Sequence, residues 1–316
     1  MKGSRRGIAW IVLLVAVTSG CANASPTPSA TLTPTAEPTA TPTPTPIPTL
    51  APTPIPLDQE MLARRFTVLV AGADTSLNRR AGGYDDANTD ALLLVSVSAD
   101  KSRIDLISLP RDTVDVPMPD GTIYRRKING IAQKLGITAL RDGMSTLLGV
   151  AIDRYVRVDM DDFAWMVDAV GGVDLTLEKA ISDPKVHLRL PAGPNHLDGS
   201  HALAFSRTRV DSDYGRAARQ QLVMMALVRK WLHPGLRALL AAAFQLGSLQ
   251  TDIGLNELPT LREIGRLATA ATVTAIVLGP PRYSLFVGIE PNSRRGWVMI
   301  PDVAEMRRYA SSALSD

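Results

Sequence analysis

Phe66-Thr67-Val68-Leu69-Val70-Ala71 is a short run of apolar and β-branched side chains, and this pattern is typical of a buried strand. A second run of the same kind covers residues 91–97, and a third covers residues 104–109 and ends at Pro110. Turn-forming residues at 100–102 separate the second run from the third. These segments predict three neighbouring strands of one sheet.

Strand-like and helix-like segments alternate along the rest of the chain. Further strands are expected at residues 155–158, 173–177, 284–287 and 297–300. Helices are expected at residues 130–148, 163–167, 198–206, 214–232, 236–246 and 258–270, with a last helix near the C-terminus. This alternation predicts an α/β fold with a central sheet and helices on both faces. Residues 61–316 are expected to form one domain, because no internal repeat or second linker interrupts them.

Residues 1–21 have the features of an export signal. Three basic residues within the first six give a positive start, residues 8–17 form a short apolar run, and small residues precede Cys21. The apolar run is too short to span a bilayer comfortably. The segment therefore predicts a lipoprotein-type signal peptide, with lipidation of Cys21 and a location on the extracytoplasmic face of the cell membrane. An uncleaved anchor and an ordinary signal peptide are the alternatives.

Residues 22–60 are rich in proline and threonine, as in the Thr-Pro repeats of residues 41–46. Proline removes backbone hydrogen-bond donors and favours the extended polyproline II conformation. This segment predicts a disordered, semi-rigid spacer. At about 3.1 Å per residue, it could extend on the order of 100 Å from the membrane.

The composition and the absent motifs exclude several classes of protein. A single cysteine allows no intramolecular disulfide and no zinc site built on thiolates. The formal net charge of +3 is small for 316 residues, whereas a protein that coats nucleic acid carries a larger basic surplus. The sequence also lacks the phosphate-binding loop, the dinucleotide fingerprint, the serine nucleophile elbow and the zinc-protease motif. The four histidines form no ligand pair at helical spacing.

Strand pairing gathers three polar residues at one edge of the predicted sheet. If the first two strands pair antiparallel, Asp74, just after the first, and Asp90, just before the second, lie at the same edge. The third strand returns to this edge and brings Arg111 there. Mg²⁺ prefers hard oxygen ligands and needs only one or two protein carboxylates beside phosphate oxygens. The alternative is that both aspartates cap loops and Arg111 forms a surface ion pair.

A second polar cluster lies at residues 205–221. Its members are Arg207, Arg209, Arg216, Arg219 and Gln220. The last three are spaced i, i+3, i+4 and share one face at the start of a predicted helix. Positive charge is unfavourable at a helix N-terminus, whereas an anion is favoured there. The cluster therefore predicts an anion site, and the alternative is a solvated basic face paired with nearby aspartates.

Nine segments, in order, carry a resemblance to the LytR-CpsA-Psr family of cell-envelope proteins. They are VAGAD at residues 70–74, NTDAL at 88–92, SLPRDT at 108–113, KIN at 127–129, LGVAIDRY at 148–155, VDAVGGV at 167–173, LDG at 197–199, SRTR at 206–209 and GRAARQ at 215–220. The resemblance is strongest over residues 66–232. It implies an α-β-α sandwich with a central mixed sheet and a hydrophobic pocket that accepts a lipid.

The same resemblance implies a function and roles for particular residues. The implied function is Mg²⁺-dependent phosphotransfer of a glycopolymer from a polyprenyl-pyrophosphate carrier to peptidoglycan. The implied metal ligands are Asp74 and Asp90. The implied pyrophosphate-binding residues are Arg111, Lys127, Arg207, Arg209, Arg216, Arg219 and Gln220. Among these, the residues expected to act in catalysis are Arg111, Arg207, Arg209 and Arg219.

The sequence departs from the family pattern at Ser76, where an arginine is common, and Arg79 or Arg80 could replace that arginine. The expected partners are the lipid-linked glycan donor, the peptidoglycan acceptor and the membrane, with no nucleic acid. A polyprenyl-pyrophosphate hydrolase and a non-catalytic envelope sensor, or transcriptional attenuator, are the alternative functions.

Overall fold

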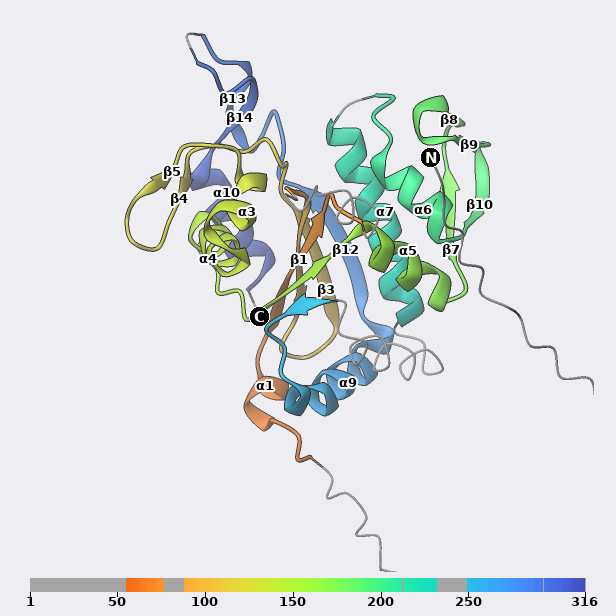
Figure 1. Ribbon diagram of the computed structural model, residues 1–316. Helices are drawn as coiled ribbons and strands as arrows, with labels where there is room; N and C mark the ends of the chain where they lie inside the picture. Colours follow the sequence, from red (N-terminus) through yellow and green to blue (C-terminus); the bar gives the residue numbers. More distant parts are fainter. Residues whose placement is uncertain (1–54, 77–87, 212, 232–248, 292, 316) are drawn as a thin grey trace, which may run out of the picture. The chain divides into compact units, whose positions relative to one another are not determined.

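A six-stranded mixed sheet forms the centre of the protein, as the computed structural model in Figure 1 shows. The strand order is β11-β6-β1-β2-β3-β12. The bounds are β1 Phe66–Ala73, β2 Thr89–Val97, β3 Arg103–Ser108, β6 Arg154–Val158, β11 Gln250–Thr251 and β12 Thr272–Val277. Strand β2 is antiparallel to β1 and β3, whereas β6 is parallel to β1 and β12 is parallel to β3. The predicted α/β fold with a central mixed sheet is confirmed.

The structure describes residues 55–76, 88–211, 213–231, 249–291 and 293–315. The signal peptide with Cys21, most of the spacer and the helix expected at 236–246 lie outside these ranges. Within the described ranges, no helix combines the length and the apolar character that a membrane span requires.

Helices cover both faces of the central sheet (Figure 1). On one face lie α3 Ile131–Leu135, α4 Ile137–Leu148 and α10 Val303–Ala313, and on the other lie α5 Met160–Ala169, α6 Gly199–Arg207 and α7 Asp213–Trp231. Leu69 and Ala71 of β1 pack with Leu140 and Met306 in the core under α4 and α10. Strand residues point alternately to the two faces of a sheet, so the neighbouring Val70 points to the other face.

The smaller elements surround this framework. The two-stranded sheets are β4 Val116–Pro117 with β5 Ile123–Tyr124, β7 Val173–Leu177 with β10 Gly193–Leu197, β8 Ile181–Asp183 with β9 Leu188–Leu190, and β13 Ser284–Ile289 with β14 Trp297–Pro301. The remaining helices are α1 Gln59–Ala63 and α9 Leu258–Leu267, with 3₁₀ turns at Ile128–Gly130, Pro184–Val186, Leu255–Glu257 and Ala268–Ala270. The β13–β14 hairpin projects from the body of the domain (Figure 1).

The helix expected at residues 130–148 is instead two helices, α3 and α4, which meet at Gly136. Gly136 has φ +93° and ψ 159°, a conformation that side chains with a Cβ rarely adopt. The apolar period continues across this glycine, so the pattern alone did not reveal the break.

A cavity of about 1220 Å³ lies between the sheet and the α5–α7 layer. Val68, Val70 and Val95 form its sheet wall. The opposite wall comes from Phe163 and Met166 of α5, Leu203 of α6, Met224 and Leu227 of α7, and Leu258 and Leu261 of α9. The cavity is therefore mostly apolar along its length. Polar residues line it where β1 ends and β2 begins, and Arg262, Glu263 and Arg266 of α9 line it at the other end.

Candidate functional site at the sheet edge

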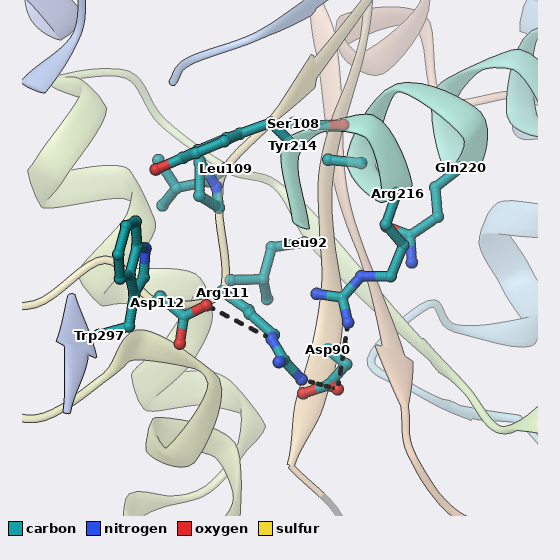
Figure 2. Close-up of a pocket in the computed structure, with 12 residues that line it drawn as sticks. Asp90, Leu92, Ser108, Leu109, Arg111, Asp112, Tyr214, Arg216, Gln220 and Trp297 are labelled. Carbon is teal, nitrogen blue, oxygen red and sulfur yellow. Dashed lines mark hydrogen bonds and ion pairs between the residues drawn. The ribbon is translucent and has the colours of Figure 1, made fainter. Parts of the chain in front are cut away.

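Asp74, Asp90 and Arg111 meet at one edge of the sheet, as strand pairing predicted. The backbone N–H of Asp74 donates to the carbonyl oxygen of Asn88 at 2.9 Å, one residue before β2. Arg111 follows β3 and forms an ion pair with Asp90 through its Nη1 atom (Figure 2). Asp74 and Asp90 line the same cavity, and the ion pair of Arg111 that the alternative expected is also present.

Asp90 lies at the centre of a cluster of arginines. Its Oδ2 atom is 3.7 Å from Nη2 of Arg209 and 3.9 Å from Nη1 of Arg216, in addition to the ion pair with Arg111. Its Oδ1 atom accepts a hydrogen bond from Nδ2 of Asn129 at 3.1 Å. One carboxylate thus faces three guanidinium groups, so positive charge exceeds negative charge around it.

Asp74 is paired with Arg207, whose Nη2 atom lies 3.7 Å from the Asp74 Oδ1 atom. The polar end of the cavity is lined by Asp74, Asp90, Arg207, Arg209, Arg216 and Gln220. With Arg111, this region brings four guanidinium groups close to Asp74 and Asp90. Such a region favours a polyanion with bidentate contacts to arginine.

Two of the predicted site residues lie away from the pockets. The described residues that line the cavity and its small neighbouring pocket do not include Arg219 and Lys127. The Arg219 guanidinium donates to both carboxylate oxygens of Asp211, at 2.8 and 2.9 Å, and to the carbonyl oxygen of Thr208 at 2.6 Å. The Lys127 Nζ atom donates to Asp112 at 2.5 Å. In this structure both cations hold the chain around the site.

Sequence reasoning missed Asp183, a carboxylate that supports the site. Asp183 accepts a hydrogen bond from the buried Thr208 hydroxyl and lines the cavity. This hydrogen bond is the main cause that lowers the pKa of Asp183 below its ordinary value of 3.8. No motif spacing links residue 183 to residue 208, so only the folded chain shows this contact.

The oxygen donors at the sheet edge fit Mg²⁺. Among the residues that the structure describes, no three His, Cys, Asp or Glu side chains gather into a metal site. Mg²⁺ retains several waters and binds proteins through one or two carboxylates together with substrate phosphates. Asp74 and Asp90 line the same cavity end, and each offers carboxylate oxygens of the kind that this mode of binding uses.

A small pocket adjoins the cavity on the Arg111 side. It is lined by Asp90, Arg111, Asp112, Tyr214, Arg216 and Trp297, with Leu92, Ser108, Leu109, Pro110, Ala217 and Gln220 completing the wall. The sequence predicted a strand around Trp297 but gave no signal that the strand reaches the site. Arg79 and Arg80, the candidates for the family's missing arginine, lie outside the described residues.

The fold and the site define an α/β protein with an arginine-rich, carboxylate-bearing end on a long apolar cavity. The family model described as the LytR_cpsA_psr family matches residues 49–279, which is most of the chain. The chain therefore belongs to this family, as the sequence motifs predicted.

Curated relatives agree with this assignment. The cell wall biosynthesis protein LcpA of Corynebacterium glutamicum is 32% identical over 185 residues, which are 49% of this chain and 35% of the relative. The polyisoprenyl-teichoic acid–peptidoglycan teichoic acid transferase TagV of Bacillus subtilis is 29% identical over 177 residues, 54% of this chain and 44% of the relative. The match thus spans about a third to a half of the length of these curated relatives.

The crystal structure of B. subtilis TagV shares the fold, with a TM-score of 0.64 at 22% identity, covering 80% of this chain and 98% of that chain. A structure described as TagT bound to LIIa-WTA gives a TM-score of 0.61 at 21% identity, covering 80% and 92%. At these identities the likeness shows the fold alone.

Proposed function

We propose that this protein is an extracytoplasmic, Mg²⁺-dependent phosphotransferase that moves a glycopolymer from a polyprenyl-pyrophosphate carrier to peptidoglycan. One observation carries the proposal: the arginine cluster with Asp74 and Asp90 lies at the polar end of an apolar cavity of about 1220 Å³. This combination suits a molecule with a polyanionic head and a long apolar tail. The names of the relatives, a cell wall biosynthesis protein and a teichoic acid transferase, support the same class of reaction.

In this proposal the residues of the chain bind and orient the donor. The apolar walls hold the polyprenyl chain, and Arg207 and Arg209 bind the pyrophosphate oxygens with Arg216 and Arg111. Asp74 and Asp90 hold Mg²⁺, which when bound supplies positive charge to the phosphate oxygens. Transfer of a phosphoryl group depends mainly on positioning and on neutralising its charge.

The proposed reaction exchanges one phosphate bond for another. A hydroxyl oxygen of the acceptor forms a bond to the phosphorus that carries the glycan, and its proton passes to solvent. The bond from this phosphorus to the bridging oxygen breaks, and polyprenyl phosphate leaves with the electron pair. A hydrolase would use water in place of the acceptor hydroxyl.

The proposed location is the extracytoplasmic face of the membrane, where both the donor and the acceptor are found. It rests on the export signal and on Cys21 as a lipidation site. In cells, Cys21→Ala should leave the domain folded and should release the protein from membranes or leave it as an unprocessed precursor.

A transfer assay with a radiolabelled polyprenyl-pyrophosphate glycan, with and without peptidoglycan, tests the function. We expect label on peptidoglycan only when Mg²⁺ is present. Asp74→Asn and Asp90→Asn should each lower transfer by about 10²–10³-fold, the scale seen when one charge-stabilising group is lost. Glu178→Gln, a change of an exposed carboxyl group outside both pockets, is the matched control. Release of the glycan into water without attachment would indicate the hydrolase, and no turnover would indicate the sensor.

A further inference from the structure

Asp90, Arg216 and Gln220 separate two spaces of different character, because each of them lines both the large cavity and the small pocket. The large cavity is mostly apolar and extends along β1 and β2. The small pocket has a volume of about 20 Å³, which is room for about one water molecule. Figure 2 shows Trp297 and Asp112 on one side of Asp90, and Arg216 and Gln220 on the other.

Trp297 is half exposed, at 50% of its surface, although it lines a pocket that contains Arg111 and Asp90. A large aromatic side chain that remains this exposed beside a site of ionic groups has a face available to a ligand. Trp297 also lies outside residues 49–279, so the family match assigns no role to it.

The β14 strand fixes Trp297 relative to the site. Two residues after Trp297, the Met299 N–H donates to the Asp112 carbonyl oxygen at 3.0 Å, and the Met299 carbonyl oxygen accepts from the Val114 N–H at 3.0 Å. The hairpin is also held by Arg295, which donates to Asp115 at 2.9 Å. The segment that carries Arg111 and Asp112 is thus bonded directly to the strand that carries Trp297.

The direction of attack in the proposed reaction points to the small pocket. In a phosphoryl transfer the attacking and the leaving oxygens lie roughly in line through phosphorus. With the polyprenyl chain in the cavity, the leaving phosphate lies on the cavity side of the Asp90–Arg216 wall. The attacking hydroxyl therefore approaches from the other side, where the pocket between Arg111 and Trp297 has room for a group of about that size.

We infer that Trp297 is a stacking platform for the sugar ring of the glycan acceptor, with the attacking hydroxyl of that sugar in the small pocket. This inference rests on the proposed function. The C–H groups on one face of a sugar ring carry partial positive charge, and the face of an indole ring carries partial negative charge. The acceptor class is therefore a glycan strand that presents a free hydroxyl, in keeping with peptidoglycan.

The experiment compares Trp297→Ala, Trp297→Phe and the control Leu285→Ala, an exposed residue of the same hairpin that lines neither pocket. Binding of chitotetraose is measured by calorimetry without donor or metal, and the KM for solubilised peptidoglycan is measured in the transfer assay. We expect Trp297→Ala to weaken chitotetraose binding and to raise this KM by about tenfold, the scale of one aromatic contact. Trp297→Phe should recover most of the loss, and Leu285→Ala should match the wild type.

Affinity for a polyprenyl pyrophosphate that carries one N-acetylglucosamine separates the acceptor from the donor. We expect Trp297→Ala to leave this affinity within twofold of the wild type. A loss of affinity confined to this donor would place the donor sugar on Trp297 and overturn the inference. Unchanged binding of the acceptor by Trp297→Ala would also overturn it. If the wild type transfers no glycan at all, the proposed function fails, whereas chitotetraose binding reports on Trp297 separately.

Discussion

At the scale of single residues, the arginines of the site divide into two groups that the sequence did not distinguish. The side chains of Arg207 and Arg209 are 47% and 52% exposed, whereas those of Arg216 and Arg219 are 6% exposed. Asp211 neutralises the charge of Arg219 through two hydrogen bonds. The exposed pair therefore suits ligand binding, and Arg219 supports the fold.

This division predicts opposite effects for two arginine substitutions. Arg219→Ala removes three hydrogen bonds, two of them to Asp211 and one to the Thr208 carbonyl oxygen. We expect it to lower the free energy of unfolding by about 1.5–3 kcal/mol, the scale for hydrogen bonds to charged groups. Arg209→Ala should change that free energy by less than about 0.5 kcal/mol, as exposed substitutions usually do.

Urea denaturation of the ligand-free variants measures both effects, and calorimetry with farnesyl pyrophosphate measures binding. Arg209→Ala should weaken this binding by about 1.5–3 kcal/mol, because a charged donor to phosphate is lost. An Arg219→Ala protein with an unchanged urea midpoint would show that the Asp211 contact contributes nothing to stability. Charge at the helix start would by itself predict that losing an arginine spares stability. The hydrogen bonds of Arg219 predict a loss of stability instead.

At the scale of elements, the local patterns determined which strands could be predicted. The runs that became β1, β2 and β3 are apolar, contiguous and separated by clear turn signals, so their type and order followed from sequence. Their antiparallel pairing then placed Asp74, Asp90 and Arg111 together. Strand β12 was missed, because its parallel partner β3 lies more than 160 residues earlier and its side chains lack a clear buried face.

The candidate site could also be predicted only in part from the sequence. The sequence predicted the residues that meet at strand ends, but not the contacts between distant loops, such as Thr208 with Asp183. Trp297 lies at the site because the backbone of Met299 is hydrogen-bonded to Asp112 and Val114. No local sequence pattern encodes this pairing. Short-range signals therefore predicted the elements, and long-range hydrogen bonds decided which of them meet.

The stability of helix α6 depends on the cap at its first turn. The helix ends at Arg207, which lines the polar end of the cavity. Asp198 caps this helix, because its Oδ1 atom accepts from the His201 N–H at 2.8 Å. This backbone hydrogen bond is the main cause that lowers the pKa of Asp198 from 3.8 to about 2. The folded state therefore favours the charged carboxylate more than the unfolded chain does.

The depressed pKa gives the cap a defined pH dependence. A group whose pKa falls on folding stabilises the protein above its unfolded pKa, and this stabilisation is lost as the pH falls through the folded pKa. At neutral pH we expect Asp198→Ala to lower the free energy of unfolding by about 1 kcal/mol. The difference from the wild type should shrink between about pH 4 and about pH 2.

Urea midpoints of the wild type, Asp198→Ala and Asp198→Ser, taken across this range, measure the effect. Serine keeps an oxygen that can cap the helix but carries no titrating charge. The stability gap between Asp198→Ser and Asp198→Ala should therefore stay constant with pH. A gap between the wild type and Asp198→Ala that also stays constant would contradict the role of the carboxylate.

At the scale of the whole domain, the arginine cluster and the first described residues of the chain lie at opposite ends of the sheet. Phe66 pairs with Val97 at one end of the β1–β2 ladder, and Ala73 pairs with Thr89 at the other. Seven steps along β1 separate these ends by about 23 Å. The chain enters beside the far end, where the Asp58 N–H donates to Thr260 Oγ1 of α9 at 2.9 Å.

The cavity extends between these two ends, and residues of α9, among them Leu258, Leu261 and Gly265, line it at the far one. A ligand with its pyrophosphate at Arg209 would extend its tail along β1 and β2 toward Leu258 and Leu261. A short prenyl chain would end before α9, whereas a long one would reach it. The effect of prenyl chain length on affinity therefore reports how far the tail extends along the cavity.

Gly265 of α9 offers a test of this arrangement. It lines the cavity, and a Cβ atom built on it would meet no atom within 4 Å in the described part of the chain. We expect Gly265→Phe to fill the far end and to lower the affinity for undecaprenyl pyrophosphate by tenfold or more. Affinity for geranyl pyrophosphate should stay within twofold, because the arginine cluster is untouched. Gly265→Ala, the matched control, should keep both affinities and stabilise the helix by up to about 1 kcal/mol. Calorimetric titration of the three proteins with both ligands measures the difference, and equal losses for the short and the long chain would mean that the tail does not run toward α9.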